Sequence, residues 1–206
     1  NGTRVRADKG IAVLTGSINA GALNGGRDMG VAQIVPIESL GSEWVAVRGS
    51  GNGSGDSATE VPFIVAARDG TNVFLNGSAS PANSSPLQAG DYYKIPQTNY
   101  DANDLLAVAT NEPAYFYQVQ NANQTNGQSL SLVAPNSDMV RANVEVPFVD
   151  SIGTTRAIFV TRVGTTISVG GTPLSGGNSP ASQPGIVVYV VNGVTGNLAA
   201  SADGPY

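Results

Sequence analysis

Short apolar runs rich in valine constrain the fold of this chain more than any other feature. Each run is bounded by Gly, Asn, Asp or Pro, a pattern typical of β-strands separated by turns. No long stretch shows the 3.6-residue periodicity of an amphipathic helix. The sequence therefore predicts an all-β protein, with strands at residues 11–14, 44–47, 61–67, 73–75, 105–109, 115–119, 157–163, 166–169 and 186–191.

An internal repeat is the second constraint on the fold. Segment 61–77 recurs loosely as segment 156–171, and Gly70 matches Gly164, 94 positions later. Each segment contains a strand, a polar-Gly-Thr turn and a second strand, which predicts a β-hairpin because Gly tolerates the reversal of the backbone. The Asn76-Gly77 and Asn192-Gly193 pairs are predicted to form type I′ hairpin turns.

A shorter pattern occurs three times, at residues 5–13, 108–116 and 200–206. In each copy a strand is followed by a small residue, Asp or Asn, any residue, Gly or Pro, and the next strand. The Asp or Asn side chain is expected to cap a turn. We therefore predict tandem repetition, with a first β-rich repeat at 1–103 and a second at 104–206. The second repeat is expected to interlock with the first into one compact unit and to run into a third copy, with both chain ends lying inside a longer array.

Repeated antiparallel strands that bury one face favour sandwich-like packing. The fold predicted is therefore an all-β chain of tandem antiparallel β-sandwich-like repeats, with large propeller-like blades as the alternative. Runs 115–119 and 186–191 are apolar on both faces and are expected to be central strands. Trp44, the single tryptophan, is expected to anchor the core.

The composition excludes several function classes. The 206 residues include no His and no Cys, which excludes disulfides, thiol nucleophiles, Ser-His-Asp triads and zinc sites of the usual kind. Ten Lys+Arg against fifteen Asp+Glu give a net charge of −5 and no basic footprint for nucleic acid. The longest apolar run, 186–191, is too short to cross a membrane as a helix. We expect no catalysis, no nucleic-acid partner and no membrane insertion.

Five of the seven tyrosines lie within 26 positions of one another. Sugars can stack on tyrosine rings, and Tyr115 and Tyr117 would share one face of a strand. This cluster is a candidate ligand site, and core packing is the competing interpretation. The candidate residues are Tyr92, Tyr93, Tyr100, Tyr115 and Tyr117.

A second candidate site is a loop with three oxygen donors in four positions, Asp101, Asn103 and Asp104. Carboxylate and amide oxygens suit Ca²⁺, although the loop lacks the Gly and terminal Glu of an EF-hand. A polar turn between strands is the alternative interpretation. Apart from Ca²⁺ at this loop, no cofactor is expected.

Glycosylation signals form a third group of candidates. Ser57 and Ser151 each follow Asp and precede an apolar residue, an arrangement that resembles an acceptor for bacterial O-glycans. Short Asn-x-Ser/Thr sequences, which are acceptors for N-glycans, occur at Asn1, Asn52, Asn76, Asn83 and Asn123. A glycoprotein is therefore expected.

The order of these elements resembles the IgGFc-binding-protein N-terminal domain family. The resemblance lies in the strand at 7–13, the stretch 36–47, the turn around 69–73 and the segment 87–93. Gly10 stands where the family usually has proline, and the cysteines of animal members are absent. These departures point to a bacterial relative and argue against an antibody-binding role. The resemblance implies a non-enzymatic surface, adhesive or structural module.

We therefore expect a non-catalytic adhesion or structural module from a longer exported repeat protein, located outside the cell or on its surface. Lysine occurs only at Lys9 and Lys94, and a surface of Ser, Thr and Asn is common on exported proteins. Expected partners are other repeats of the chain, neighbouring copies, glycans and surface glycoproteins. Two alternatives remain, a carbohydrate-binding module that uses the tyrosines and a glycoside hydrolase that uses a pair of acids.

Overall fold

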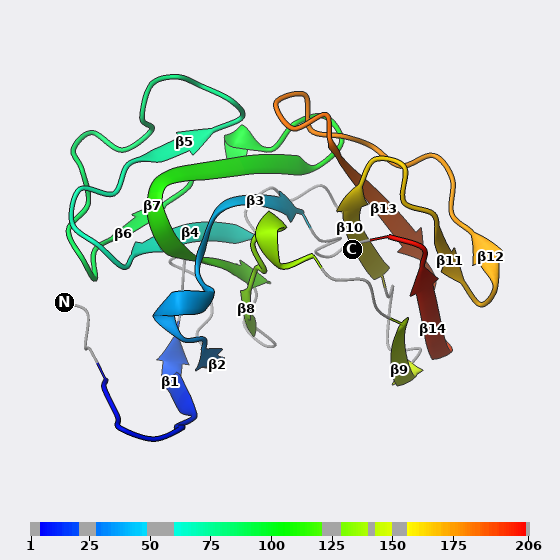
Figure 1. Cartoon of the computed structure of the whole chain (residues 1–206), viewed down its shortest axis with the longest axis horizontal. Coiled ribbons are helices and arrows are strands. Elements are labelled where there is room, and N and C mark those ends of the chain that lie inside the picture. Colours follow the sequence, from blue (N-terminus) through cyan, green and yellow to red (C-terminus); the bar gives the residue numbers. More distant parts are fainter. Residues whose placement is uncertain are drawn as a thin grey trace.

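One long, bent strand, β7 (Leu105–Gln120), lies at the centre of the computed structural model (Figure 1). The structure describes residues 5–20, 28–48, 60–120, 129–139, 143–149 and 156–204. This part of the chain is all-β, with no α-helix, as predicted.

The strands before β7 are β1 (Val13–Ala20), β2 (Asp28–Ile34), β3 (Gly41–Val47), β4 (Val61–Ala66), β5 (Val73–Leu75) and β6 (Tyr92–Lys94). Those after it are β8 (Ser129–Leu132), β9 (Asn143–Val149), β10 (Arg156–Arg162), β11 (Ile167–Val169), β12 (Thr172–Pro173), β13 (Ile186–Asn192) and β14 (Gly196–Ala202). The described residues also form three short 3₁₀ turns, η1 (Ile37–Ser39), η3 (Gln97–Asn99) and η4 (Asn136–Asp138).

The bend divides β7 into two arms with different neighbours. The first arm (105–110) pairs with β3 and β5, and the second arm (114–120) pairs with β4 and β8, all antiparallel. At the bend, β7 advances from Ala109 to Ala114 while β3 changes only from Glu43 to Gly41. Bends of this kind let one strand pass from one layer to the next. Figure 1 shows the first arm above and the second arm curving back below it.

The first hydrophobic core lies between the two arms of β7. Trp44 from β3 and Phe116 from the second arm are almost fully buried there, with ring centroids 5.6 Å apart. Leu106 and Val108 on the first arm face the same core and have no exposed surface. Trp44 is thus a core anchor, as predicted.

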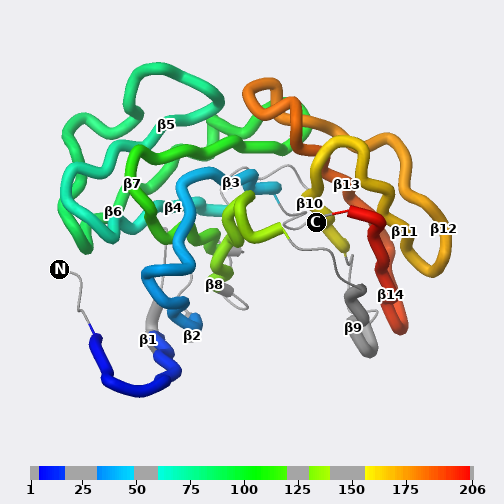
Figure 2. Tube along the Cα trace, viewed as in Figure 1, coloured from blue at the N-terminus to red at the C-terminus, as the bar shows by residue number. Residues whose placement is uncertain are grey.

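Two further cores stack on the first. Leu105, on the opposite face of the first arm, packs with Val45 and Val47 against Ile186 and Val188 of β13. The other face of the β10–β13 pair covers a third core, which contains Phe159, Ile167, Leu198 and Ala200. Figure 2 shows the same order, with the β10–β13 pair between β3 and the strands β14, β11 and β12.

Run 115–119 lies in β7, which has neighbours on both edges, as predicted for a central strand. β13 pairs only with β10 among the described strands, so the prediction that run 186–191 is a central strand was wrong, although both of its faces contact cores.

The two segments that match in sequence follow the same path in space. Gly70 and Gly164 both have positive φ, +81° and +89°, a conformation that favours glycine. After each of them a short strand pairs in the same register with a later strand. The pairs are Val73–Thr110, Phe74–Ala109 and Leu75–Val108 in the first segment, and Ile167–Ala202, Ser168–Ser201 and Val169–Ala200 in the second.

The predicted turn caps are also observed at matching places. The Oδ1 atom of Asn111 accepts a hydrogen bond from the backbone N of Asn72 at 2.6 Å. The Oδ1 atom of Asp203 accepts one from the backbone N of Thr166 at 2.7 Å. However, Asn111 lies inside β7, so residues 108–116 form a bend within one strand and not a turn between two.

The predicted hairpins were wrong in their pairing. β4 pairs with β6 and β7, and β5 pairs with β7, so the turn at Gly70 carries the chain to another layer. β10 and β11 are separated in the same way, because β10 pairs with β13 and β11 with β12 and β14. Asn76-Gly77 has the two positive φ angles of a type I′ turn, but the chain after it forms no return strand. β13 and β14 lie in different sheets, so Asn192-Gly193 closes no hairpin.

Every predicted run contributes to a strand, although runs 105–109 and 115–119 merge into β7. The described chain forms a single domain of several antiparallel sheets. The predicted boundary between residues 103 and 104 lies just before β7. Because β7 pairs with β3, β4 and β5, strands on the two sides of this boundary share one sheet. The division into two repeats with that boundary stays a prediction.

We predict that Phe116→Ala lowers the free energy of unfolding by about 3–5 kcal/mol, because it leaves a cavity between the arms of β7. Urea unfolding followed by tryptophan fluorescence measures the change, since Trp44 contacts this ring. Tyr92→Ala, at a side chain that is 69% exposed, is the control and should change stability by no more than about 0.5 kcal/mol. Equal losses in the two variants would contradict the assignment of the first core.

Candidate functional site

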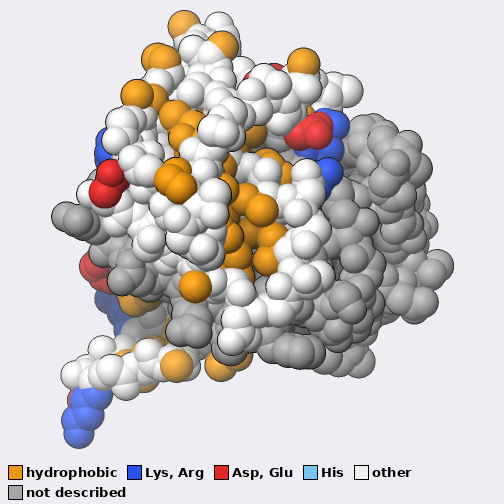
Figure 3. Space-filling model, turned by 90° about the vertical axis from the view of Figure 1, so that its right-hand side faces the viewer, with side chains coloured by type: hydrophobic (Ala, Val, Ile, Leu, Met, Phe, Trp, Pro, Cys, Tyr) orange, Lys and Arg blue, Asp and Glu red, His pale blue; other side chains and the backbone are white. Residues whose placement is uncertain are grey.

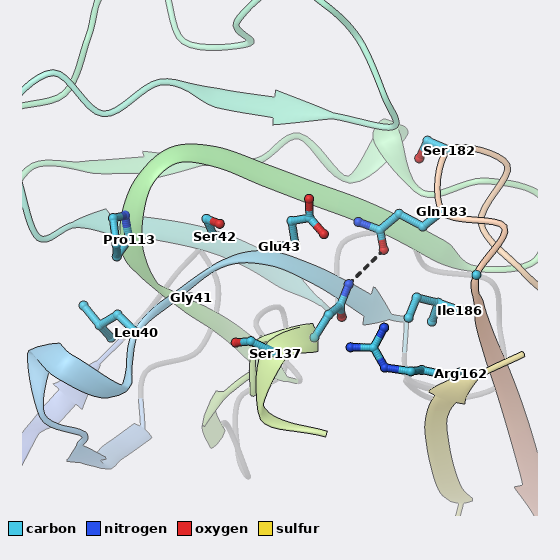
Figure 4. A pocket seen from close by; sticks show the side chains of 12 residues that line it. Leu40, Gly41, Ser42, Glu43, Pro113, Ser137, Arg162, Ser182, Gln183 and Ile186 are labelled. Atoms are coloured by element: carbon cyan, nitrogen blue, oxygen red, sulfur yellow. Dashed lines mark hydrogen bonds between the residues drawn. The ribbon is translucent and has the colours of Figure 1, made fainter. Parts of the chain in front are cut away.

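A cleft of about 680 Å³ opens where β3, the bend of β7, η4, the end of β10 and the loop before β13 meet. Figure 4 shows its lining residues, which come from parts of the chain more than 140 positions apart. They are Leu40, Gly41, Ser42, Glu43, Pro113, Asn136, Ser137, Arg162, Ser182, Gln183, Gly185 and Ile186.

The floor of the cleft depends on one glycine. A Cβ atom on Gly41 would overlap the ring of Pro135 and approach Ser137, so only glycine lets β3 pass this close to η4. Across the cleft, Nδ2 of Asn136 donates a hydrogen bond to Oε1 of Gln183 at 3.1 Å (Figure 4). This bond joins η4 to the loop before β13. The cleft is therefore built from elements that are fixed to one another.

The cleft is lined by both polar and apolar residues and carries charges of both signs. Glu43 supplies a carboxylate and Arg162 a guanidinium, both on exposed side chains. Ser42, Ser137 and Ser182 add hydroxyl groups to the lining. A site of this kind can hold a polar ligand by several hydrogen bonds. The sequence analysis missed this cleft, because its residues form no local motif.

The five candidate tyrosines do not form one surface. Tyr115 and Tyr117 share a face of β7, as predicted, and their rings stack with centroids 6.2 Å apart. Tyr92 occupies the same face through its pairing with Val65, which is also opposite Tyr115. Tyr93 and Tyr100 instead pack on the first core. The cluster is thus divided between two faces of the sheet.

Exposure limits what these rings can bind. Tyr117 is 5% exposed and stacks on Phe63, with centroids 5.5 Å apart. The hydroxyl of Tyr115 donates to the carbonyl of Val35, and burial raises the pKa of both Tyr115 and Tyr117. Tyr92 alone among the five is largely open to solvent. Ligand binding by the five tyrosines stays a prediction.

The candidate calcium loop is engaged in internal bonds. Oδ1 of Asp101 accepts hydrogen bonds from the backbone N of Asn103 and of Leu105, at 2.8 and 2.9 Å. Asp104 has a φ of +61° and its Oδ1 lies 3.0 Å from Nη1 of Arg48. A cation at this loop would compete with that guanidinium for Asp104. Calcium binding here stays a prediction, and the described residues contain no group of three or more acids that could hold a metal.

Glu60 and Gln118 form a buried polar cluster that feels the charge of Arg48. Glu60 is only 3% exposed, and its Oε2 accepts a hydrogen bond from Nε2 of Gln118 at 2.8 Å. Nε2 of Gln118 also donates to the carbonyl of Val47. Burial raises the pKa of the Glu60 carboxyl, while the Gln118 hydrogen bond and the charge of Arg48 oppose the rise. Arg48 also lies 4.6 Å above the ring of Tyr100, and burial raises the pKa of that phenol.

The candidate glycosylation sites have different outcomes. Ser57, Ser151, Asn1, Asn52 and Asn123 lie outside the described residues. Asn83 is 7% exposed, and its amide bonds the backbone of Val73 and Ser85. Asn76 is exposed, but its amide bonds both β7 and the carbonyl of Asn99. Both described amides are therefore engaged in bonds within the protein, and modification stays a prediction.

We predict that Glu60→Gln stabilises the protein at pH 7, because it removes the cost of burying a carboxylate while the bond to Gln118 can persist. Since burial raises the folded-state pKa above the ordinary 4.5, this cost is absent below pH 4.5 and develops as the pH rises through the folded-state pKa. Urea unfolding across pH 4–8 measures the difference between variant and wild type. The exposed Glu38→Gln controls for the loss of one carboxylate. Destabilisation by Glu60→Gln at pH 7 that disappears at pH 4 would contradict this account.

The comparison with known proteins identifies the family. The family model described as IgGFc binding protein matches residues 1–205. No curated protein and no solved structure matches the chain. Domains of this family are non-catalytic binding modules of extracellular proteins, and within the described residues no helix is long and apolar enough to span a membrane. The chain therefore belongs to the IgGFc binding protein family.

Proposed function

We propose that this chain is a non-catalytic adhesion and structural module within a longer extracellular repeat protein. The observation that carries the proposal is the shared strand β7, which lies in the second predicted repeat (104–206) and pairs with β3, β4 and β5 of the first (1–103). Units linked by a flexible hinge would each keep their own strands. Here the strands of the first predicted repeat are held together by β7, a strand that belongs to the second.

This arrangement suits a protein that must stay folded under mechanical force. On the second arm of β7, β4 pairs with residues 114–119 along one edge and β8 pairs with residues 117–120 along the other. Its core-facing side chains, Ala114 and Phe116, are 1% and 0% exposed. Separating the two predicted repeats would therefore break the backbone pairing of β7 and, at the same time, expose the first core to water.

The cleft supports the adhesive part of the proposal. Its carboxylate, guanidinium, amides and hydroxyls match the polar groups of a glycoprotein surface, and none of its described lining residues is aromatic. One carboxylate, Glu43, lies in the described lining, whereas glycoside hydrolysis ordinarily uses two. Tyr92 is the exposed ring among the candidate tyrosines, which offers one stacking surface for a sugar. A glycoprotein ligand held in the cleft therefore fits better than a hydrolase or a tyrosine-based sugar site.

The test uses IgG Fc as a model glycoprotein, because the family model is named for it, although Gly10 and the missing cysteines argue against antibodies as the natural ligand. Immobilised protein is titrated with intact Fc, with Fc stripped of its N-glycan, and with a glycan array. We expect saturable binding that weakens about tenfold in Arg162→Ala, the effect of losing one charge-assisted hydrogen bond of about 1.5 kcal/mol. Arg156→Ala is the matched control, since Arg156 is exposed on the same strand and lies outside the cleft.

Each outcome of this experiment has a defined interpretation. Binding that needs the glycan identifies a sugar in the cleft, and binding that survives deglycosylation identifies a protein surface. Binding that is lost equally in Arg156→Ala and Arg162→Ala would remove the cleft from the proposal. Failure of all three probes to bind would contradict the adhesive role.

A further inference from the structure

Two Asn-Gly pairs lie within the described residues, and the structure holds them in different ways. They are Asn76-Gly77 after β5 and Asn192-Gly193 at the end of β13. Asparagine followed by glycine is the sequence most prone to deamidation, because glycine has no side chain to shield its backbone nitrogen from the Asn side chain. Both asparagines are exposed to solvent. A difference in their reactivity must therefore come from how each pair is held.

Deamidation requires the asparagine side chain and the following backbone to move together. The backbone nitrogen of the glycine attacks Cγ of the asparagine, so that an N–Cγ bond forms and the Cγ–Nδ2 bond breaks. The side-chain nitrogen leaves as ammonia with the proton of the glycine nitrogen, and a cyclic imide remains. Water then opens the imide to give aspartate or isoaspartate. Hydrogen bonds that fix the asparagine amide therefore slow the reaction.

The amide of Asn76 is held at both of its polar atoms. Its Oδ1 accepts a hydrogen bond from the backbone N of Ala107 at 3.1 Å, and its Nδ2 donates to the carbonyl of Asn99 at 2.7 Å. The backbone N of Asn76 also donates to the carbonyl of Ala107, at 2.9 Å. These bonds tie Asn76 to β7 and to the end of η3. Attack on its Cγ would break both side-chain bonds.

The two glycines differ in the same direction. Both have positive φ, +76° at Gly77 and +69° at Gly193. A Cβ atom on Gly77 would overlap the side chain of Ser182, so the loop before β13 packs directly on this turn. No described atom lies within 4 Å of the place where a Cβ on Gly193 would stand. Figure 3 shows the face of the molecule on which β11 to β14 lie. The nitrogen of Gly77 is therefore fixed by packing, and the nitrogen of Gly193 is not.

Asn192 has none of the restraints found at Asn76. It is the last residue of β13, and its partner Arg156 is the first residue of β10, so the two form the end pair of their ladder. Within the part of the chain that the structure describes, neither the Asn192 amide nor the backbone N of Gly193 makes a hydrogen bond. The end of a ladder opens more readily than its interior. The Asn192 side chain can therefore rotate toward the nitrogen of Gly193.

We propose that Asn192 is a site of spontaneous deamidation in the folded protein, and that Asn76 is protected from the same reaction by its hydrogen bonds. Water is the only co-reactant. The product carries a new carboxylate opposite the exposed Arg156, and opposite charges that face each other in an antiparallel pair attract. Isoaspartate also lengthens the backbone between β13 and β14, which lie in different sheets. Asn192 lies outside the described lining of the cleft, so the modification is independent of the proposed function.

Tryptic peptide mapping of the aged protein tests this proposal. The folded protein is incubated at mildly alkaline pH and then digested, and mass spectrometry follows the loss of the amide in two peptides. Peptide 69–94 contains Asn76 and peptide 163–206 contains Asn192, each as its one Asn-Gly pair. We expect the loss at Asn192 to be about 30-fold faster, the factor that corresponds to two hydrogen bonds of about 1 kcal/mol each. In urea, which removes the fold, the two rates should become similar.

An Asn192→Gln variant assigns the signal, because glutamine forms the corresponding larger ring far more slowly. The change in peptide 163–206 should disappear in this variant, while peptide 69–94 behaves as in the wild type. Equal rates at Asn76 and Asn192 in the folded protein would overturn the proposal, and so would the absence of any reaction at Asn192. A rate ratio that persists unchanged in urea would also overturn it, since the ratio would then come from the neighbouring Ser78 and Val194 and not from the fold.

Discussion

The pairing of β7 with neighbours in two layers is the interaction on which the rest of the structure depends. A strand of sixteen residues could remain straight, but the bend at residues 110–113 turns its second half beneath its first. This places Leu106 and Val108 opposite Phe116 across one core, and Leu105 on the other face against β13. The bend therefore creates the first core and positions the surface on which the third layer packs.

The candidate site follows from the same bend. Pro113 at the bend, Gly41 on β3 and Arg162 at the end of β10 line one cleft because β7 brings their strands into adjacent layers. β4 pairs with β6 and with the second arm of β7, whereas β10 pairs with β13 alone among the described strands. Adhesion at the cleft would thus be a consequence of this architecture.

Local features were predictable from the sequence, and long-range pairing was not. Valine-rich runs identified most strands, and Gly70 and Gly164 identified turns, because both depend on local preferences. The predicted runs missed β2, β6, β8, β9, β12 and β14. In β14, the Ala, Ser and Asn residues carry little apolar pattern. Both hairpins were mispaired, since only the cores decide that β4 and β5 lie in different layers. Glu60 and Gln118, 58 positions apart, and the residues of the cleft likewise meet only through the tertiary fold.

Native-state hydrogen exchange at the backbone amides of β7 tests the central role of this strand most directly. If β7 holds both layers together, the protected amides of its two arms exchange only through global unfolding, with the same free energy. Increasing urea should then lower that free energy with the same slope in both arms. Exchange of the second arm by a separate, lower-energy opening while the first arm stays protected would contradict the account.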